Sequence, residues 1–432
     1  MFLTEDRKSY WKPILEHENV APIKDKYRAN VTAALLENQE KAMAYGIEGE
    51  LKEAVTVTQA GSAPLANWDP VLIQLVRRAA PNFMAYDVAG VQPMTGPTGL
   101  IFAMKSRYTS QNGTEALFNA ANTSFSGTGA EAMAKANYYT SNNATTGAGV
   151  STQVGEKVGG PGTNDLDWND MSFSIEKTSV EAKTRMLQAQ YTVELAQDLK
   201  AIHGLDAETE LSNIVSTEIL HEINREMIHY IRKVAKLGFA SAKYSAGSPV
   251  LDSNGNFATT TAGSFDLNVN TDGRWAGEKY KGLLIKIHRE ANVIARETRR
   301  GRGNFLIVSS DVAAVLDLTG KLQYSPPIND SFNYDDTGNT FAGTLSGRYR
   351  VYIDPYAAYD EIIVGYKGSN AWDAGIYYCP YVPLQMVRAL DPDTYQPKIA
   401  FKTRYGVVSN PFVGNMNGNA NSYFRKFAVS GL

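Results

Sequence analysis

Cysteine is nearly absent from this sequence: Cys379 is the single one among 432 residues. A lone cysteine excludes an intramolecular disulfide and a cysteine-rich zinc site. The chain also lacks a run of about 18 apolar residues that could cross a membrane, and its first residues lack the basic head and apolar core of a signal peptide. We therefore expect synthesis in a reducing, cytoplasm-like compartment, no membrane partner, and stability that comes from packing and subunit contacts.

A strong excess of positive or negative charge is missing as well. The formal net charge is −3, with 43% hydrophobic and 20% charged residues, close to the average of globular proteins. The length allows two or three packed units with a sizeable core. A near-neutral chain is not a strongly basic nucleic-acid binder, so we expect no sequence-specific contact with DNA.

The signatures of common enzymes are also missing. The sequence has no His-Glu-x-x-His, no phosphate-cradling Gly-x-x-x-x-Gly-Lys-Ser/Thr and no Gly-x-Ser-x-Gly. The five histidines are scattered, and His221 and His229, on one predicted helix, lie about 80° apart around its axis, which makes a poor metal pair. We predict no catalytic residue, no metal ligand, no cofactor and no enzymatic activity.

Two weaker features have ordinary interpretations. Asp252–Asn256 resembles a calcium loop, but its glycine stands at the fourth place instead of the sixth, so we interpret it as a hairpin turn. The basic cluster Arg296–Arg302 is interpreted as a solvated helix end that complements the helix dipole. A phosphate or subunit contact is the alternative for that cluster.

Hydrophobic periodicity and turn residues predict an α+β fold with mainly antiparallel strands. The strongest helix is residues 207–237, capped by Asp206, whose apolar residues are mostly three or four apart and which forms a rod of about 46 Å. Further helices are predicted at 187–202, 275–296 and 310–318. Strands are predicted at 88–94, 100–108, 171–175, 305–308, 349–353, 362–366, 375–378, 386–390, 399–405 and 423–429.

Three segments outside these elements have distinct compositions. Residues 1–53 are charged and largely helical by pattern, and they form either a solvated arm or a detachable assembly segment. Residues 54–66 have the composition of an extended linker, followed by a short amphipathic helix at 70–79. Residues 109–166 are rich in Gly, Ser, Thr and Asn, which is typical of a long surface excursion.

A set of short stretches runs through most of the chain in a fixed order: Tyr10–Glu16, Glu37–Lys41, Val76–Ala79, Gly90–Met94, Gly96–Gly99, Glu194–Leu199, Glu222–Glu226, Tyr349–Asp354, Val364–Gly368, Tyr378–Pro383 and Phe401–Gly406. Together they resemble the major capsid (head shell) protein family of T-even-type tailed bacteriophages, the myoviruses. So many matches in one order are far more specific than any single motif.

The resemblance implies the Hong Kong ninety-seven phage capsid fold. The implied divisions are an N-terminal assembly (scaffold-like) segment at 1–53, an N-arm at 54–90, an E-loop with a reduced insertion at 91–185, a peripheral domain with a spine helix at 186–300, an axial domain at 301–400 and a return to the peripheral domain at 401–432. Well-known members carry a folded insertion in the E-loop, for which residues 109–166 look too short and too rich in Gly and Ser.

The implied function is that of a structural subunit of an icosahedral or prolate phage head, which self-assembles into hexameric capsomers and encloses double-stranded DNA. The implied partners are other copies in the hexamers and shell lattice, a scaffold, a prohead protease, the portal and vertex proteins, and a chaperonin of the host or phage. The protein is then part of the virion and is assembled in the bacterial cytoplasm.

The resemblance also implies a maturation cleavage. The family's prohead protease cuts after Glu in Leu/Ile-x-Glu, and Leu51-Lys52-Glu53 before Ala54 fits this pattern where charge gives way to the linker. We therefore predict cleavage between Glu53 and Ala54. Position supports this choice more than the motif does, because the same pattern ends at Glu5, Glu16, Glu37 and Glu222.

Three other functions remain open at the level of the sequence. A pentameric vertex paralogue has the same fold, and copy number in the virion separates the two. An encapsulin-like shell around a cargo enzyme is opposed by the prohead-type N-terminal segment. A hydrolase of unknown type is disfavoured by the missing motifs, and a turnover screen tests it.

Overall fold

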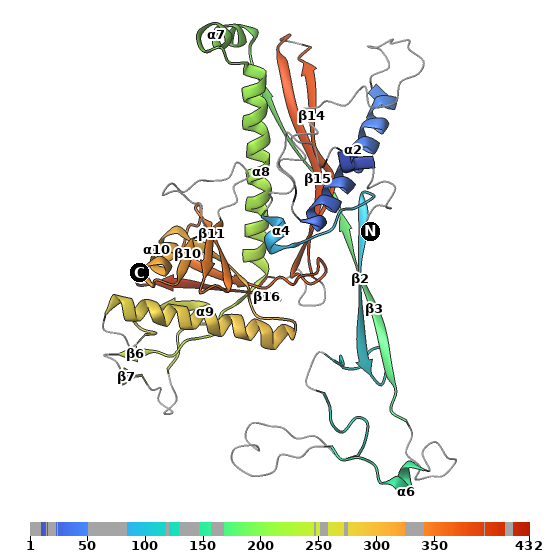
Figure 1. The fold of residues 1–432 in the computed structure, drawn as a ribbon, viewed down its shortest axis with the longest axis vertical. Coiled ribbons are helices and arrows are strands. Elements are labelled where there is room, and N and C mark those ends of the chain that lie inside the picture. The colour runs from blue at the N-terminus through green and yellow to red at the C-terminus, as the bar shows by residue number, and fades with distance from the viewer. Residues whose placement is uncertain are drawn as a thin grey trace. The chain divides into compact units, whose positions relative to one another are not determined.

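The computed structural model describes residues 10–13, 15, 23, 25–50, 84–117, 121–128, 147–156, 168–245, 248–250, 258–271, 275–324, 341–392, 394–410 and 418–432. The chain divides into two compact units: unit 1 is Met1–Gly99 with Val180–Leu432, and unit 2 is Leu100–Ser179. Unit 2 is thus inserted into unit 1 along the sequence. Figure 1 shows the elements of both.

Unit 2 is built on a two-stranded ribbon. It holds most of β2 (Thr98–Tyr108) and β3 (Met171–Glu181), which pair with each other, and the short helix α6 (Thr152–Gly155). The rings of Tyr108 and Phe125 lie 4.4 Å apart at the end of the ribbon. The predicted strands at 100–108 and 171–175 are confirmed.

The smaller sheet of unit 1 has four described strands in the order β1 (Gly90–Val91), β14 (Ile376–Leu390), β15 (Pro397–Ser409) and β4 (Lys183–Gln190). Strands β14 and β15 form a long antiparallel hairpin whose register shifts near Pro380 and Val382. Proline lacks the N–H that a ladder needs, which accounts for an irregularity beside Pro380 and Pro383. Strand β14 is continuous where the sequence predicted two strands.

The larger sheet of unit 1 has eight described strands. Seven follow the order β10 (Leu322–Tyr324), β11 (Phe341–Leu345), β12 (Tyr349–Asp354), β9 (Phe305–Ser309), β13 (Glu361–Gly365), β16 (Asn421–Ser430) and β5 (Ala235–Leu237), and β8 (Ser264–Asp266) also pairs with β16. A separate two-stranded sheet joins β6 (Tyr244–Ser245) to β7 (Ser248–Pro249). Most pairings are antiparallel, and the predicted α+β class is confirmed.

The helices of unit 1 pack against these sheets or against another helix. They are α2 (Lys26–Glu50), α4 (Ala85–Val88), α7 (Val193–His203), α8 (Ala207–Val234), α9 (Ala276–Thr298) and α10 (Ser310–Leu318). Helix α8 runs from the larger sheet along the smaller one (Figure 1), and it buries Ile219, Ile223, Met227 and Ile231 at intervals of four. That spacing places them on one face, as the sequence predicted.

Two apolar cores meet at strand β9. Phe305 and Ile307 belong to the core shared with α8 and the smaller sheet, whereas Leu306 and Val308 belong to the core under α9 and α10. Alternate residues of a strand point to opposite faces, so both faces of β9 are covered. The predicted buried strand at 305–308 is confirmed.

Two predicted helix boundaries are wrong. Residues 187–190 belong to strand β4, because Leu187 and Ala189 alternate with exposed residues and pair with β15. The helix predicted at 187–202 is α7, which begins at Val193, after Thr192 accepts a hydrogen bond from the N–H of Leu195. It ends before Gly204, whose φ of 68° is left-handed.

The long helix also ends earlier than predicted. It stops at Val234, and Ala235–Leu237 pairs with β16 as strand β5. The predictions for residues 54–66, residues 70–79 and Asp252–Asn256 lie outside the described residues. Within the described part of the chain, no helix is both long and apolar enough to span a membrane.

Candidate functional site

The predicted cleavage residues Glu53 and Ala54 lie outside the described residues, and α2 ends at Glu50. Both histidines considered for a metal pair lie on α8, His221 beside a surface pocket and His229 four residues before Lys233. Among the residues that the structure describes, no group of three or more His, Cys, Asp or Glu side chains could hold a metal ion. The described residues instead form docked and exposed surfaces.

The N-terminal helix α2 is docked on unit 1. All residues from 31 to 39 are buried, and Val31 and Leu35 belong to the core that includes α8 and the smaller sheet. The contact lies against β14. Residues 31–39 are thus part of the packed body, and the solvated-arm interpretation is wrong for them.

Polar groups fix the register of α2. The Nη2 of Arg28 lies 2.8 Å from Oδ1 of Asp87 in α4, and the hydroxyl of Tyr27 donates to the carbonyl of Val91. The amide nitrogen of Asn38 donates to the carbonyls of Met94, at 2.8 Å, and Tyr381, at 2.9 Å. Tyr381 lies where the register of β14 shifts, so Asn38 satisfies a carbonyl beside that irregularity.

The ribbon of unit 2 has one exposed apolar face. Its members occupy alternate positions of the two strands and are all more than half exposed: Leu100, Phe102, Met104, Met171, Phe173 and Ile175. On the other face Glu176 lies 3.1 Å from Lys105 and 3.0 Å from Arg107. A contiguous exposed apolar face of this kind marks an interaction surface.

A second exposed apolar surface lies at one end of unit 1. No residue of α7 is buried, and Figure 1 shows α7 at the end of α8 that the tips of β14 and β15 also reach. An ion pair of 2.7 Å between Arg388 of β14 and Glu208 of α8 joins the helix to the strand. The exposed apolar side chains are Val193, Leu195, Ile202, Leu205, Val387, Leu390 and Tyr395.

Buried charges hold α8 and α9 to the larger sheet. Asp354, which is 2% exposed, lies 2.5 Å from Arg225 and 3.3 Å from Arg232 of α8. Glu290 of α9 is 1% exposed and lies 2.6 Å from Lys286 and 2.7 Å from Arg425 of β16. These ion pairs connect helices and strands that are far apart in the sequence, and they leave neither buried carboxylate unpaired.

The structure supports the helix-end interpretation of the cluster Arg296–Arg302 for most of its length. Arg299 is the left-handed C-cap of α9, and Glu297 pairs with Lys236 and Arg425. Arg300 lies 3.7 Å from Asp373. These contacts are all within unit 1.

Burial is the main cause of the pKa shifts of Cys379, His229 and His288 in unit 1. Burial raises the pKa of the Cys379 thiol to about 12, so this thiol stays protonated and unreactive at neutral pH. The pKa of His229 is lowered by burial and then by Arg225 and Arg232. Burial also lowers the pKa of His288, whose Nδ1 lies 2.8 Å from the hydroxyl of Tyr349.

Comparison with known proteins gives matches along nearly the whole chain. The sequence profile of the family described as major capsid protein Gp23 matches residues 65–429. The major capsid protein of Vibrio phage KVP40 is 36% identical over an alignment of 521 residues, which covers 98% of this chain and 99% of that protein. The capsid vertex protein of Enterobacteria phage T4 is 27% identical over 263 residues, 58% of this chain and 55% of that protein.

Among solved structures, the capsid of Myoviridae phage XM1 aligns with a TM-score of 0.42 and 8% identity, covering 80% of this chain and 92% of that one. The profile match spans both units, whereas the match to the vertex protein covers little more than half of the chain.

Proposed function

The chain belongs to the major capsid protein Gp23 family, and on that premise we propose that it builds the shell of a tailed-phage head from hexameric capsomers that enclose double-stranded DNA. The observation that carries this proposal is the 36% identity to a major capsid protein over 98% of the chain. The major role is favoured over the vertex role because the vertex match covers 58% of the chain.

The exposed ribbon gives the proposal a physical basis. A two-stranded ribbon is marginally stable in water by itself, and an apolar face makes it prone to association. Each large apolar side chain that becomes buried contributes about 1.5–3 kcal/mol. A second copy that covers Phe102, Phe173 and their neighbours therefore stabilises both the ribbon and the lattice, and closed symmetry repeats this contact around the shell.

We propose that the ribbon is the E-loop and that α8 is the spine helix. The two sheets of unit 1 suggest other domain boundaries than the expected 186–300, 301–400 and 401–432. Residues 376–409 share a sheet with β4, which supports placing them in the peripheral domain. Strand β16 lies beside β13 in the larger sheet and α9 packs on that sheet, which supports placing both in the axial domain.

We retain cleavage between Glu53 and Ala54 as a proposal. The burial of residues 31–39 adds a condition to it, because a cut after Glu53 leaves α2 docked until its apolar face separates from β14. N-terminal sequencing of purified virions tests the cut: Ala54 as the first residue supports it, and Met1 contradicts it.

The other partners remain proposals that rest on the resemblance: a scaffold, a prohead protease, portal and vertex proteins, and a chaperonin. We also propose that the chain has no enzymatic role and is assembled in the bacterial cytoplasm. The alignment with the Vibrio phage KVP40 protein spans 521 residues, more than the 432 residues of this chain, and we propose that a reduced E-loop insertion accounts for part of the difference.

Negative-stain electron microscopy of the chain, expressed alone and with its genomic neighbours, tests the structural role. Hexamers, tubes or closed shells are expected. A persistent monomer in the presence of scaffold and chaperonin contradicts the proposal. The copy number per virion then separates the hexameric role from the vertex role.

A further inference from the structure

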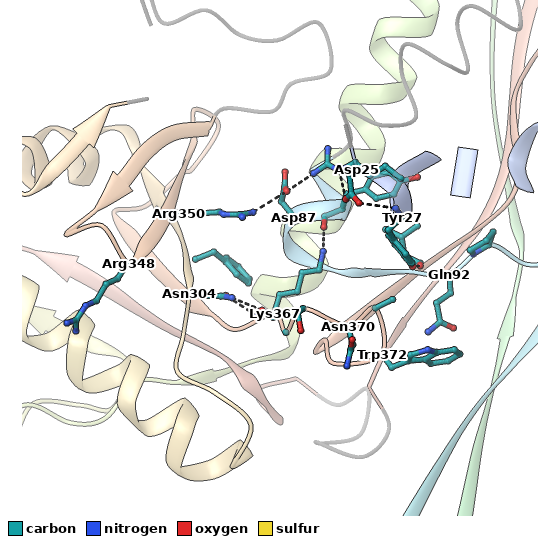
Figure 2. A pocket seen from close by; sticks show the side chains of 18 residues that line it. Asp25, Tyr27, Asp87, Gln92, Asn304, Arg348, Arg350, Lys367, Asn370 and Trp372 are labelled. Atoms are coloured by element: carbon teal, nitrogen blue, oxygen red, sulfur yellow. Dashed lines mark hydrogen bonds and ion pairs between the residues drawn. The ribbon is translucent and has the colours of Figure 1, made fainter. Parts of the chain in front are cut away.

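A cavity of about 850 Å³ lies in unit 1 beside the start of α2 (Figure 2). It is lined by α4, the segment after β1, the turn before β12 and the loop that follows β13. Its charged lining consists of four cations and two carboxylates: Arg28, Arg348, Arg350, Lys367, Asp25 and Asp87. The cavity wall therefore carries an excess of positive charge.

The two carboxylates do not balance the four cations one by one. Oδ1 of Asp87 lies 2.8 Å from Nη2 of Arg28 and 3.5 Å from Nη1 of Arg350, and Oδ2 of Asp25 lies 3.8 Å from Nε of Arg28, so both carboxylates face Arg28. Lys367 donates from Nζ to the backbone carbonyl of Tyr86, and it forms no ion pair with any described residue. An ammonium group has three donors, which leaves Lys367 with unused capacity.

A side-chain amide at the cavity has no acceptor in the part of the chain that the structure describes. The side-chain nitrogen Nε2 of Gln92 is buried and has no hydrogen-bond partner among the described residues. Figure 2 shows Gln92 on the side of Lys367 that faces Asn370 and Trp372, away from Arg348. Buried donors without acceptors cost free energy unless a ligand supplies the acceptors.

We propose that this cavity binds a phosphate group beside Lys367 and Arg350, with their cationic groups as the donors. A phosphate group carries close to two negative charges at neutral pH and matches the excess of two cations, whereas a single carboxylate matches only half of it. Guanidinium forks suit the geometry of phosphate oxygens. The proposal concerns a site within one subunit and does not depend on shell assembly.

The state of Lys367 gives the site a testable pH dependence. The pKa of Lys367 is lowered to about 8: burial has the largest effect, Asp87 and Asp25 act in the opposite direction, and Arg28 and Arg350 add to the lowering. The two tyrosines at the cavity ionise at higher pH, because burial raises the pKa of Tyr27 to about 12 and that of Tyr86 further. An anion bound beside Lys367 favours its charged form.

Calorimetric titration of the full-length chain with sulfate, at fixed ionic strength, tests the site. Sulfate stays doubly charged between pH 7 and pH 9, so any pH dependence comes from the protein. The wild-type affinity is expected to fall severalfold across this range as Lys367 loses its proton. Lys367→Gln should weaken binding at pH 7 by at least about tenfold and remove the pH dependence.

Two further variants separate binding from folding. Lys367→Arg keeps the charge, so it should retain sulfate binding and lose the pH dependence. Lys183→Gln, an exposed lysine on β4, is the matched control and should bind like the wild type. The proposal is wrong if sulfate binds with a Kd above about 10 mM, or if Lys367→Gln and Lys183→Gln bind equally.

The source of the phosphate is decided by comparing inorganic phosphate, a mononucleotide and a short single-stranded DNA. Trp372 is more than half exposed at the cavity, so a base can stack on its ring. A nucleotide that binds more tightly than phosphate, and loses this gain in Trp372→Ala, identifies a nucleotide source. Equal affinities identify free phosphate. Binding of an acidic peptide without any binding of sulfate or phosphate overturns the proposal.

Discussion

Strand β9 of unit 1 and strand β3 of unit 2 differ in what covers them. All five residues of β9 are buried, because helices and a second sheet cover both of its faces. Strand β3 has eleven residues, of which Val180 alone is buried. Unit 1 thus carries its own cores, whereas the ribbon exposes an apolar face. We propose that assembly covers this face, so that the subunit combines a self-sufficient body with an arm that other copies complete.

The largest expected effect comes from a buried charge of the body. Glu290→Ala leaves Lys286, which is 5% exposed, without a carboxylate, so the free energy of unfolding should fall by about 3–5 kcal/mol. Urea unfolding of the isolated chain, followed by tryptophan fluorescence, measures it. Glu210→Ala on the exposed side of α8 is the control and should change stability by less than about 0.5 kcal/mol. Equal stability of the two variants contradicts the account.

A pair of apolar truncations compares the two regions directly. Ile307→Ala in β9 removes a side chain from the core and should destabilise the isolated chain by about 2–5 kcal/mol. Phe102→Ser on the exposed face of the ribbon should change the stability of the isolated chain by less than about 0.5 kcal/mol, yet reduce shell assembly. Unfolding curves and electron microscopy of both variants measure this, and normal shells from Phe102→Ser contradict the role of the ribbon.

Docking of the N-terminal helix should respond to Asn38. Asn38→Ala removes two hydrogen bonds to backbone carbonyls, each worth about 0.5–1.5 kcal/mol. The amides of α2 should then exchange with deuterium about tenfold faster or more, while those of β9 stay unchanged. Lys26→Ala, at the exposed start of the same helix, should leave exchange as in the wild type. Unchanged exchange in Asn38→Ala means that other contacts hold α2.

Acid should weaken the body through His229, which is exposed, and His288, which is half-buried, with the smallest effect. The pKa of His229 and that of His288 are lowered from the ordinary value of 6.5, so the unfolded chain binds more protons as the pH falls below about 6.5. The free energy of unfolding should therefore decrease in that range. His229→Gln with His288→Gln should flatten the decrease, and His221→Gln should not. A curve with the wild-type slope in the double variant rules out this origin.

Local pattern predicted the elements that are defined by their own periodicity. The stripe from Val215 to Val234 predicted α8, and the alternation around Phe173 predicted β3. Strand β5 was missed because Ala235–Leu237 continues a helical pattern, and only pairing with β16 makes it a strand. Tertiary pairing overrides local propensity at such positions.

The docking surfaces were less visible in the sequence. Glu37, Asn38 and Gln39 are buried, although polar residues are expected at the surface. The apolar run Ala33–Leu36 just before them was the one local signal of packing. The cavity around Lys367 joins side chains from residue 25 to residue 372, and no local pattern relates positions so far apart.

Methionine oxidation tests the central claim, that assembly covers the apolar face of the ribbon. Met104 and Met171 are more than half exposed on that face, and Met227 is buried in α8. Limited hydrogen peroxide treatment followed by peptide mass spectrometry should oxidise the first two in the free chain and protect them in assembled shells, with Met227 protected in both states. Equal oxidation of Met104 and Met171 in free chain and shells would contradict the account.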